Sequence, residues 1–356
     1  MIYIHVPFCR SFCTYCDFYS EIACKGRDLD QFEAYTDSIC HEIESRRDDI
    51  EASSTPDTIY IGGGTPSVLP LSCLERIVKA TGVRGADEFT IEVNPDDIVG
   101  KGIDYVAGLL DLGVNRVSMG VQSLDDGILR WMNRRHDAAT AARAFGILRK
   151  AGVGNISVDV IFGLSHLDLS TLDGTLDGIL SWNPEHVSAY QLSIEEGSAL
   201  ARMVEDGRYT EADEEQCRAQ YELICRRLGE HGMHHYEISN WAVSGREAVH
   251  NSGYWKRLPY AGFGPGAHSF RGNGRKWNTQ EISGWTSGSE QLSKEDERVE
   301  KIMLGLRTGQ GVEKSICDSR AVRDLIEQGA LIENGERIRI PESHFFTSEQ
   351  IIRALL

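Results

Sequence analysis

The feature that most constrains the fold of this chain is a repeated alternation of short apolar runs with longer segments of helical periodicity. Runs rich in Val, Ile, Tyr and Phe are predicted as strands over Ile2–Val6, Thr58–Ile61, Phe89–Val93, Arg116–Val121, Ile156–Phe162 and His186–Leu192. Helical spacing between them predicts helices over Phe32–Ile50, Leu71–Ala80, Ile103–Leu112, Ala138–Ala151 and Leu172–Leu180. Three of these helices run into a glycine suited to a left-handed helix end, namely Gly82, Gly113 and Gly152. The alternation predicts an α/β fold with a parallel sheet covered by helices, either doubly wound or curled into a barrel.

Residues with distinctive chemistry follow the predicted strands. Cysteines come after the first strand, Gly62–Ser67 after the second, Glu92 and Asn94 end the third, and Gln122 ends the fourth. Parallel sheets and barrels carry their sites at the carboxyl ends of the strands. We therefore expect these scattered positions to converge on one rim.

The rest of the chain is organised differently. At roughly 150 residues per domain, 356 residues suggest about two domains. The alternation is lost after Leu228, and His231–Arg275 is expected to form ordered loop and edge structure. A charged helix from Lys294, helical spacing over Val322–Gln328 and the alternating run Arg337–Ile340 predict a small α+β tail. The predicted divisions are a core over residues 1–230, a connecting region over 231–293 and a C-terminal helical, winged-like domain over 294–356.

Composition excludes several classes of function. Hydrophobic residues make up 41% and charged residues 26% of the chain, which is typical of a globular protein. The 54 acidic and 37 basic residues give a net charge of −17, which repels polyanions, and we expect no DNA partner. No apolar run approaches the roughly 18 residues that cross a membrane, and the N-terminus does not read as a secretion signal. We expect a cytoplasmic protein without an integral membrane segment.

Three of the nine cysteines form a cluster with the spacing C-x3-C-x2-C, namely Cys9, Cys13 and Cys16. A structural zinc site usually has four ligands, and a disulfide would leave one thiol over. Three thiolates on a four-iron cluster would leave one iron open to a further ligand, whereas simple burial of three small apolar residues is the plain alternative. The remaining cysteines are isolated and are expected to serve packing: Cys24, Cys40, Cys73, Cys217, Cys225 and Cys317.

The segment Tyr3–Phe18 carries a family resemblance. Its sequence YIHVPFCRSFCTYCDF resembles the start of radical S-adenosylmethionine (SAM) proteins, and more narrowly the oxygen-independent coproporphyrinogen III oxidase-like branch with its HemW-type heme chaperones. The resemblance covers nearly the whole chain and implies a partial (β/α)6 TIM-like barrel. It also implies that Cys9, Cys13 and Cys16 hold a [4Fe-4S] cluster whose fourth iron binds SAM, and that the reduced cluster cleaves SAM to a 5′-deoxyadenosyl radical.

The same resemblance implies a set of SAM contacts. Glycines allow backbone groups to approach a ligand closely, and an arginine suits a carboxylate. Taken singly, these acidic residues could be ordinary strand ends and the arginine a solvated charge. The implied contacts are Gly63, Gly64 and Thr65 at the methionyl amino group, Glu92, Gln122, Arg134 at the carboxylate, Asp159 towards the ribose and adenosine, and Tyr3 beside SAM.

Two features separate the branches of this family. Coproporphyrinogen dehydrogenases carry a cysteine two positions after the third cluster ligand, where this chain has Phe18. The stretch His250–Trp255 fits the HNxxYW pattern of the HemW-like proteins, which implies heme ligation by His250. The plain alternative is a packed histidine, and the rival ligands are His268, His234 and His235.

The expected function is therefore that of a radical SAM heme chaperone. It would bind a [4Fe-4S] cluster, SAM and heme, receive electrons from a donor, and deliver heme to acceptor hemoproteins. One alternative is an oxidoreductase, the oxygen-independent coproporphyrinogen III oxidase of porphyrin biosynthesis. Another is a radical SAM enzyme that modifies RNA, which the negative charge disfavours.

Overall fold

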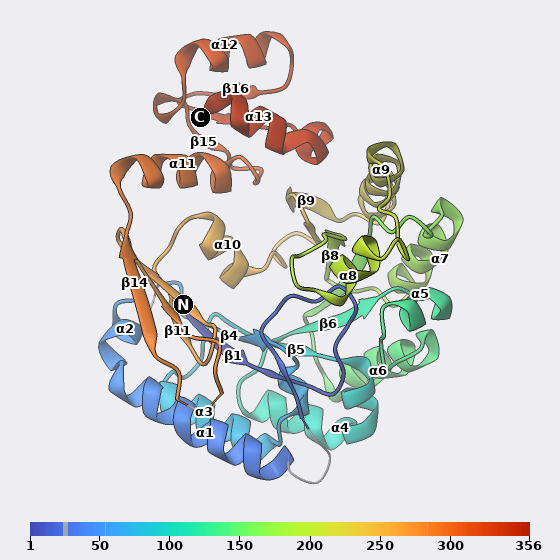
Figure 1. The fold of residues 1–356 in the computed structure, drawn as a ribbon, viewed down its shortest axis with the longest axis vertical. Helices are drawn as coiled ribbons and strands as arrows, with labels where there is room; N and C mark the ends of the chain where they lie inside the picture. The colour runs from blue at the N-terminus through green and yellow to red at the C-terminus, as the bar shows by residue number, and fades with distance from the viewer. Residues whose placement is uncertain (24–27, 54, 283) are drawn as a thin grey trace.

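The computed structural model describes residues 1–23, 28–53, 55–282 and 284–356. Cys24, expected to serve packing, lies outside the described residues. Figure 1 shows the course of the chain, with the outer helices following one another around a curved sheet and the C-terminal elements set to one end.

The centre of the fold is a nine-stranded sheet of order β11-β1-β4-β5-β6-β7-β8-β10-β9. Its six central strands are parallel and confirm the predicted ones to within two residues: β1 (Ile2–Val6), β4 (Thr58–Gly63), β5 (Glu88–Val93), β6 (Arg116–Gln122), β7 (Ile156–Phe162) and β8 (His186–Gln191). Beyond β1 lies β11 (Ala261–Phe263), and beyond β8 lie β10 (Asn240–Ala242) and β9 (His234–Glu237). Among the described strands, β11 and β9 end the sheet without pairing with each other, so the six βα units form a partial barrel.

The five predicted helices are confirmed in position. The predicted first helix divides into two, and the predicted helix Ile103–Leu112 is the second half of α4, which begins at Pro95 and is interrupted at Gly102 with a φ of +74°. Helices α5, α8 and α9 were not predicted. Gly82 and Gly152 have φ of +73° and +100° and end their helices as expected. The bounds are α1 (Asp28–Ser45), α2 (Arg47–Glu51), α3 (Leu71–Thr81), α4 (Pro95–Asp111), α5 (Asp126–Trp131), α6 (Ala138–Ala151), α7 (Leu169–Leu180), α8 (Ala199–Glu205) and α9 (Glu214–Glu230).

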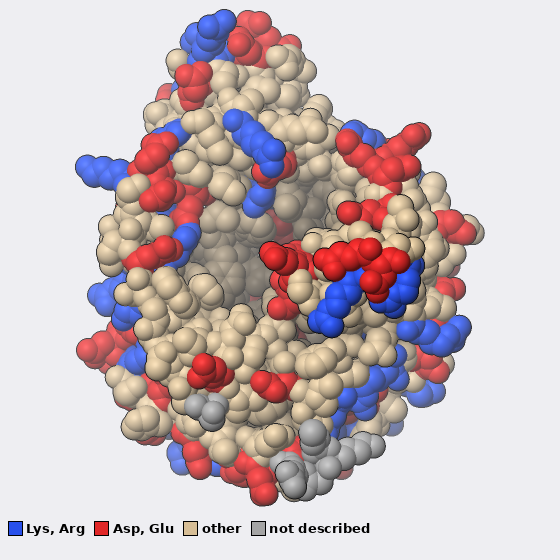
Figure 2. Space-filling model, in the orientation of Figure 1, with Lys and Arg blue, Asp and Glu red and all other residues tan. Residues whose placement is uncertain are grey.

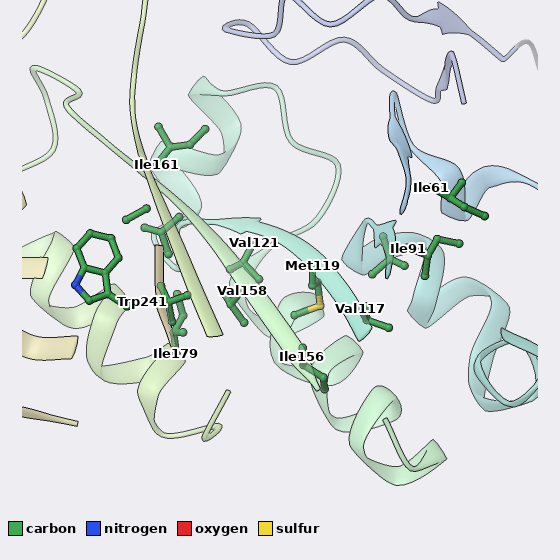
Figure 3. Packing of buried hydrophobic residues seen from close by; sticks show 14 of the residues in the cluster. Ile61, Ile91, Val117, Met119, Val121, Ile156, Val158, Ile161, Ile179 and Trp241 are labelled. Atoms are coloured by element: carbon green, nitrogen blue, oxygen red, sulfur yellow. The ribbon is translucent and has the colours of Figure 1, made fainter. Parts of the chain in front are cut away.

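Strand alternation divides the core from the interior of the barrel. In β6, Val117, Met119 and Val121 are buried and belong to the hydrophobic core together with Ile156 and Val158 of β7 (Figure 3). Since successive side chains of a strand point to opposite faces, the intervening residues of β6 face the inside of the barrel. This alternation lets one strand both pack the helices and line a site.

Residues 231–293 are more regular than the expected loop and edge structure. They supply β9, β10 and β11 to the edges of the main sheet, as well as helix α10 (Val249–Trp255). A separate antiparallel sheet is formed by β12 (His268–Arg271), β13 (Gly274–Asn278) and β14 (Ser287–Gln291). The ordered edge structure expected over His231–Arg275 is therefore confirmed. Helix α10 and the strands β12 and β13 were not predicted, because tertiary pairing orders short segments that have no clear period of their own.

The C-terminal segment contains helices and a small sheet, as expected. Its strands β15 (Val312–Glu313), β17 (Arg337–Arg339) and β16 (Ile332–Asn334) pair in that order, beside α11 (Lys294–Gly305), α12 (Ser319–Glu327) and α13 (Ser348–Leu355). The Ile238 amide donates to the Arg307 carbonyl at 3.0 Å, which links this segment to the main sheet. The two predicted domain boundaries stay predictions. Across the described stretches, no helix is both long and apolar enough for a bilayer crossing.

Short connecting elements complete the chain. A two-stranded sheet of β2 (Phe8–Cys9) and β3 (Glu21–Ile22) flanks the cysteine cluster. Short 3-10 helices follow β4 at η1 (Pro66–Val68), β15 at η2 (Lys314–Ile316) and β17 at η3 (Glu342–Thr347).

Candidate functional site

A cavity of about 570 Å³ opens at the carboxyl ends of the parallel strands. Figure 2 shows the molecule hollowed at its centre, with acidic side chains gathered on the side where α8 lies. The cavity wall includes the three clustered cysteines and seven of the predicted SAM contacts: Cys9, Cys13, Cys16, Gly63, Gly64, Thr65, Glu92, Gln122, Arg134 and Asp159. We call this space the first cavity.

The loop that carries the cysteines is anchored on both sides. Thr14 donates its amide to the Met132 carbonyl at 3.2 Å, and Leu200 donates its amide to the Thr14 carbonyl at 2.8 Å. Burial raises the pKa of Cys9 and raises that of Cys16 to about 12. Without a metal ion both thiols are therefore protonated at neutral pH, and a bound metal would displace these protons.

Thiols are the donor set that iron–sulfur clusters require. Within the described parts of the chain, no three Cys, His, Asp or Glu side chains are arranged to hold one metal ion. In a cluster each thiolate binds a different iron atom, so three sulfur atoms need not converge on one point. The assignment of the three cysteines as cluster ligands stays a prediction.

The glycine-rich stretch packs directly against the cysteine loop. The Gly64 amide donates to the Val6 carbonyl at 2.8 Å, and the Thr65 amide donates to the Phe8 carbonyl at 2.7 Å. A Cβ atom on Gly64 would lie 2.8 Å from the Phe8 carbonyl oxygen, too close for any other residue. The glycines thus let the end of β4 approach the metal loop, and the Thr65 hydroxyl lies 3.4 Å from Cys9 Sγ.

Arg134 joins the cysteine loop to the strand ends. Its Nη1 donates to Cys13 Sγ at 3.5 Å and its Nη2 donates to Asn94 Oδ1 at 2.8 Å. Burial opposes its charge, but Tyr15 and Cys13 raise the pKa of Arg134 above its ordinary value, so it is a fixed cation.

Two of the buried polar atoms in this wall that make no hydrogen bond with the described residues lie beside the cysteine loop and the end of β6. They are the Nε donor of Arg134 and the Oε1 acceptor of Gln122, a residue that ends β6 with a φ of +70°. Buried polar groups normally find a partner, and strained backbone clusters at functional sites. An amino acid such as the methionyl part of SAM has a carboxylate and an ammonium group that fit an unpaired donor and acceptor. The residues present therefore fit the cofactor that the resemblance implies.

The inner faces of the strands add carboxylates to the cavity. Glu92 Oε1 accepts from the Tyr60 hydroxyl at 2.7 Å, and the Ser118 hydroxyl lies 3.2 Å from Asp159 Oδ1. Burial raises the pKa of Glu92 to about 7, with Asp159 adding to the rise, and burial also raises the pKa of Asp159. The buried Arg116 faces both carboxylates and its Nε has no hydrogen-bond partner. The floor of the cavity is polar and charged.

Replacing Glu92 by glutamine should stabilise the cofactor-free protein at high pH. The carboxyl has a pKa of about 7 when folded against an ordinary 4.5. The folded state therefore binds the Glu92 proton more tightly than the unfolded state does. This protonated carboxyl contributes its full stabilisation below pH 4.5, and as the pH rises through 7 the free energy of unfolding falls by up to about 3 kcal/mol. In urea unfolding, Glu92→Gln should exceed the wild type by about 1–3 kcal/mol at pH 8 and not at pH 4.5. A pH dependence unchanged by the substitution would contradict this.

Two predicted site residues lie elsewhere. Tyr3 lines a neighbouring cavity, where its hydroxyl pairs with His5 Nδ1 at 3.0 Å. His250 is fully buried in α10, and its Nδ1 and Nε2 lie 2.8 Å from the Thr58 and Tyr254 hydroxyls. Burial lowers the pKa of His250 to about 3. Both ring nitrogens are thus engaged by protein hydroxyls in this structure, and ligation of a heme iron by His250 stays a prediction.

Several residues of the first cavity were missed by the sequence argument. These are the inward-facing residues of the middle of the strands, namely Tyr60, Arg116, Ser118, Ser188 and Tyr190. The alternation of Arg116, Ser118 and Gln122 with the apolar residues of β6 is the signal that could have found the residues of this strand. Most of the predicted site residues of the strands lie at or near the carboxyl ends of these strands.

Comparisons with known proteins agree with this geometry. The model of the radical SAM superfamily matches residues 3–179. The chain is 32% identical to the heme chaperone HemW of Bacillus subtilis (strain 168), over 94% of this chain and 93% of that protein. It is 31% identical to the heme chaperone HemW of Mycobacterium tuberculosis (strain ATCC 25618 / H37Rv), over 100% of this chain and 94% of that protein.

A solved structure shares the fold. The coproporphyrinogen III oxidase HemN from Escherichia coli, described as a radical SAM enzyme, superimposes with a TM-score of 0.82. The superposition covers 99% of this chain and 89% of that chain at 20% identity. At that identity the likeness concerns the fold.

Proposed function

Since the chain belongs to the radical SAM superfamily, and within it to the HemW-type branch, we propose that it binds heme and delivers it to acceptor hemoproteins. The [4Fe-4S] cluster and SAM follow from the family. The observation that carries the proposal is the near full-length similarity to HemW heme chaperones of different bacteria.

The first cavity supports the binding of the cluster and SAM. Cys9, Cys13 and Cys16 supply three thiolates on its wall, and three ligands leave one iron of a four-iron cluster open. When bound and reduced, the cluster supplies the electron for reductive cleavage of SAM. The protein's part is to hold the cofactor and to shield it from water.

Different polar residues of the cavity are suited to different chemical groups of SAM. Arg134 is a fixed cation with an unpaired buried donor, which suits the SAM carboxylate. The Gln122 acceptor suits the ammonium group. Glu92 and Asp159, deeper in the barrel, can accept hydrogen bonds from ribose hydroxyls.

Phe18 argues against turnover of a porphyrinogen. Its side chain is 65% exposed and lines the first cavity, at the position where the resemblance implies a cysteine in the coproporphyrinogen dehydrogenases. A phenyl ring can neither donate a proton nor accept one, so this contact cannot take part in acid–base chemistry. The chain thus lacks one group that the oxidase branch carries.

The thiols support a reducing compartment. The eight cysteines within the described residues are all free, which is typical of the cytoplasm. We propose a cytoplasmic protein that receives electrons from a donor protein and passes heme to acceptor hemoproteins.

A hemin titration tests the proposed function. Protein with its cluster reconstituted anaerobically should take up about one heme per chain with a saturable Soret absorbance change, followed at fixed protein concentration. The matched measurement uses the same protein with metal-free protoporphyrin. Failure of the chain to bind hemin saturably would contradict the proposal.

A further inference from the structure

A second cavity, of about 730 Å³, adjoins the first one. Both are lined by Asp17 and Phe18, so they meet at the end of the cysteine loop. Its volume falls within the range of about 300–1,000 Å³ found for sites of small molecules and cofactors. Its wall is largely aromatic, with Tyr3, Phe18, Tyr19, Tyr254, Tyr260 and Phe270.

The aromatic wall is braced by the HNxxYW segment. Tyr254 packs edge-on against Tyr260 with ring centroids 4.7 Å apart, and its hydroxyl lies 2.8 Å from His250 Nε2. His250 is fixed in turn by the Thr58 hydroxyl. The histidine of the motif therefore positions Tyr254, and Tyr254 is the member of the motif that lines the cavity.

Two histidines line the second cavity, and they differ in availability. His5 is engaged through both nitrogens, with the Tyr3 hydroxyl at 3.0 Å and the Tyr19 carbonyl at 2.9 Å. His268 is exposed at the start of β12, and its ring makes no hydrogen bond or ion pair with any residue that the structure describes. It stacks at 6.4 Å on Trp277 across the strand pair. An imidazole free at both nitrogens is a suitable iron ligand.

Two arginines and a glutamate form the polar side of this cavity. Arg257 is 9% exposed and its Nε donates to Glu300 Oε2 at 3.0 Å. Its Nη2 lies within ion-pair distance of the same oxygen, at 2.9 Å, and makes no hydrogen bond with the described residues. Arg275 forms ion pairs with both Glu300 and Glu290, and its side chain is 38% exposed. Guanidinium groups at the edge of an aromatic cavity suit the carboxylates of an otherwise apolar ligand. The carboxylates of Glu300 and Asp17 offset the positive charges of the two arginines.

We propose that the second cavity is the heme site, with His268 as the iron ligand, Arg257 and Arg275 at the propionates, and Tyr254, Tyr260 and Phe270 against the macrocycle. This inference rests on the proposed function, since it assigns the place where the heme is held. It puts the heme next to the cluster cavity, with Phe18 between them. It also moves the iron ligand from His250 to His268.

Hemin titrations of three proteins test the assignment. The wild type should show the absorbance and electron paramagnetic resonance signals of imidazole-ligated heme. His268→Ala should change both signals and weaken hemin binding about tenfold or more, with free imidazole restoring the signals. His234→Ala is the matched control, because this exposed histidine of β9 pairs with Glu247 outside both cavities. It should behave as the wild type.

The proposed contact between the arginines and the heme propionates is tested by a separate binding measurement. Arg275→Gln should weaken binding of hemin several-fold and leave unchanged the binding of its dimethyl ester, which has no propionate charge. Equal binding of hemin by the wild type and this variant would overturn the propionate assignment.

The outcomes separate the site from the function. If the wild type binds no hemin, the proposed function fails. If it binds hemin and His268→Ala keeps the same signals, the function stands and the second cavity is not the site. Loss of the imidazole signals in His250→Gln but not in His268→Ala would equally overturn the assignment and identify the motif histidine as the ligand.

Discussion

Replacing Cys13 by alanine should yield a protein that retains essentially no iron after anaerobic reconstitution. Cys13 lies on the wall of the first cavity, and its sulfur accepts from Arg134 at 3.5 Å. With only two of three thiolates left, a four-iron cluster would have two irons without a protein ligand. The measurement is iron and sulfide content per chain, together with the broad visible absorbance of the cluster.

Cys40→Ala is the matched control for this loss. Cys40 is a partly buried free thiol on α1, packed against the hydrophobic core and not part of the first cavity. This variant should keep the cluster in full. A cluster of undiminished iron content in Cys13→Ala would show that the three cysteines are not its ligands.

Replacing Arg134 by alanine should weaken SAM binding by about 10- to 150-fold while the cluster is retained, because a hydrogen bond to a charged group contributes about 1.5–3 kcal/mol. The guanidinium spans Cys13, Asn94 and the strand ends, and its Nε is unpaired. Equilibrium dialysis of SAM against reconstituted protein measures the affinity, and iron content in the same samples shows whether the cluster survives.

Two further variants separate charge from geometry at this position. Arg134→Lys keeps the cation but not the planar fork, so it should recover only part of the affinity. Arg143→Ala changes an exposed arginine on α6 outside the cavity and should have no effect. Full SAM affinity in Arg134→Ala would exclude the proposed carboxylate contact.

The sequence was sufficient to predict the central strands and the rim on which they end. The strands are short runs of Val, Ile and aromatic residues, and parallel strands collect their ends at one edge. The residues that line the inner part of the first cavity could not be predicted in this way. Arg116 and Ser118 read as ordinary strand residues until the register of β6 against β7 shows that they face inward beside Asp159.

The histidines show a different limit of sequence reasoning. His250 lies in a recognisable motif and His268 does not, so a motif favours the first as an iron ligand. Their availability depends on tertiary contacts: Thr58 is 192 residues from His250 and occupies one of its nitrogens. The pairing of β12 with β13 leaves His268 at a cavity wall. Neither the contact of His250 with Thr58 nor the position of His268 at the cavity wall can be predicted from the local sequence.

The join between the two cavities gives Phe18 a specific position. It lines both spaces, so a ligand of the second cavity lies beside the end of the cysteine loop. A heme there would be separated from the cluster site by one exposed aromatic side chain.

The most direct test of the account offers two tetrapyrroles to one preparation. Protein with a reconstituted cluster, SAM and a reductant is divided, and one part receives hemin while the other receives coproporphyrinogen III under anaerobic conditions. Mass spectrometry of the porphyrins and the Soret absorbance are then recorded. We expect uptake of about one heme per chain and a coproporphyrinogen of unchanged mass. Loss of carbon dioxide from coproporphyrinogen with formation of protoporphyrinogen would contradict this expectation and identify an oxidase.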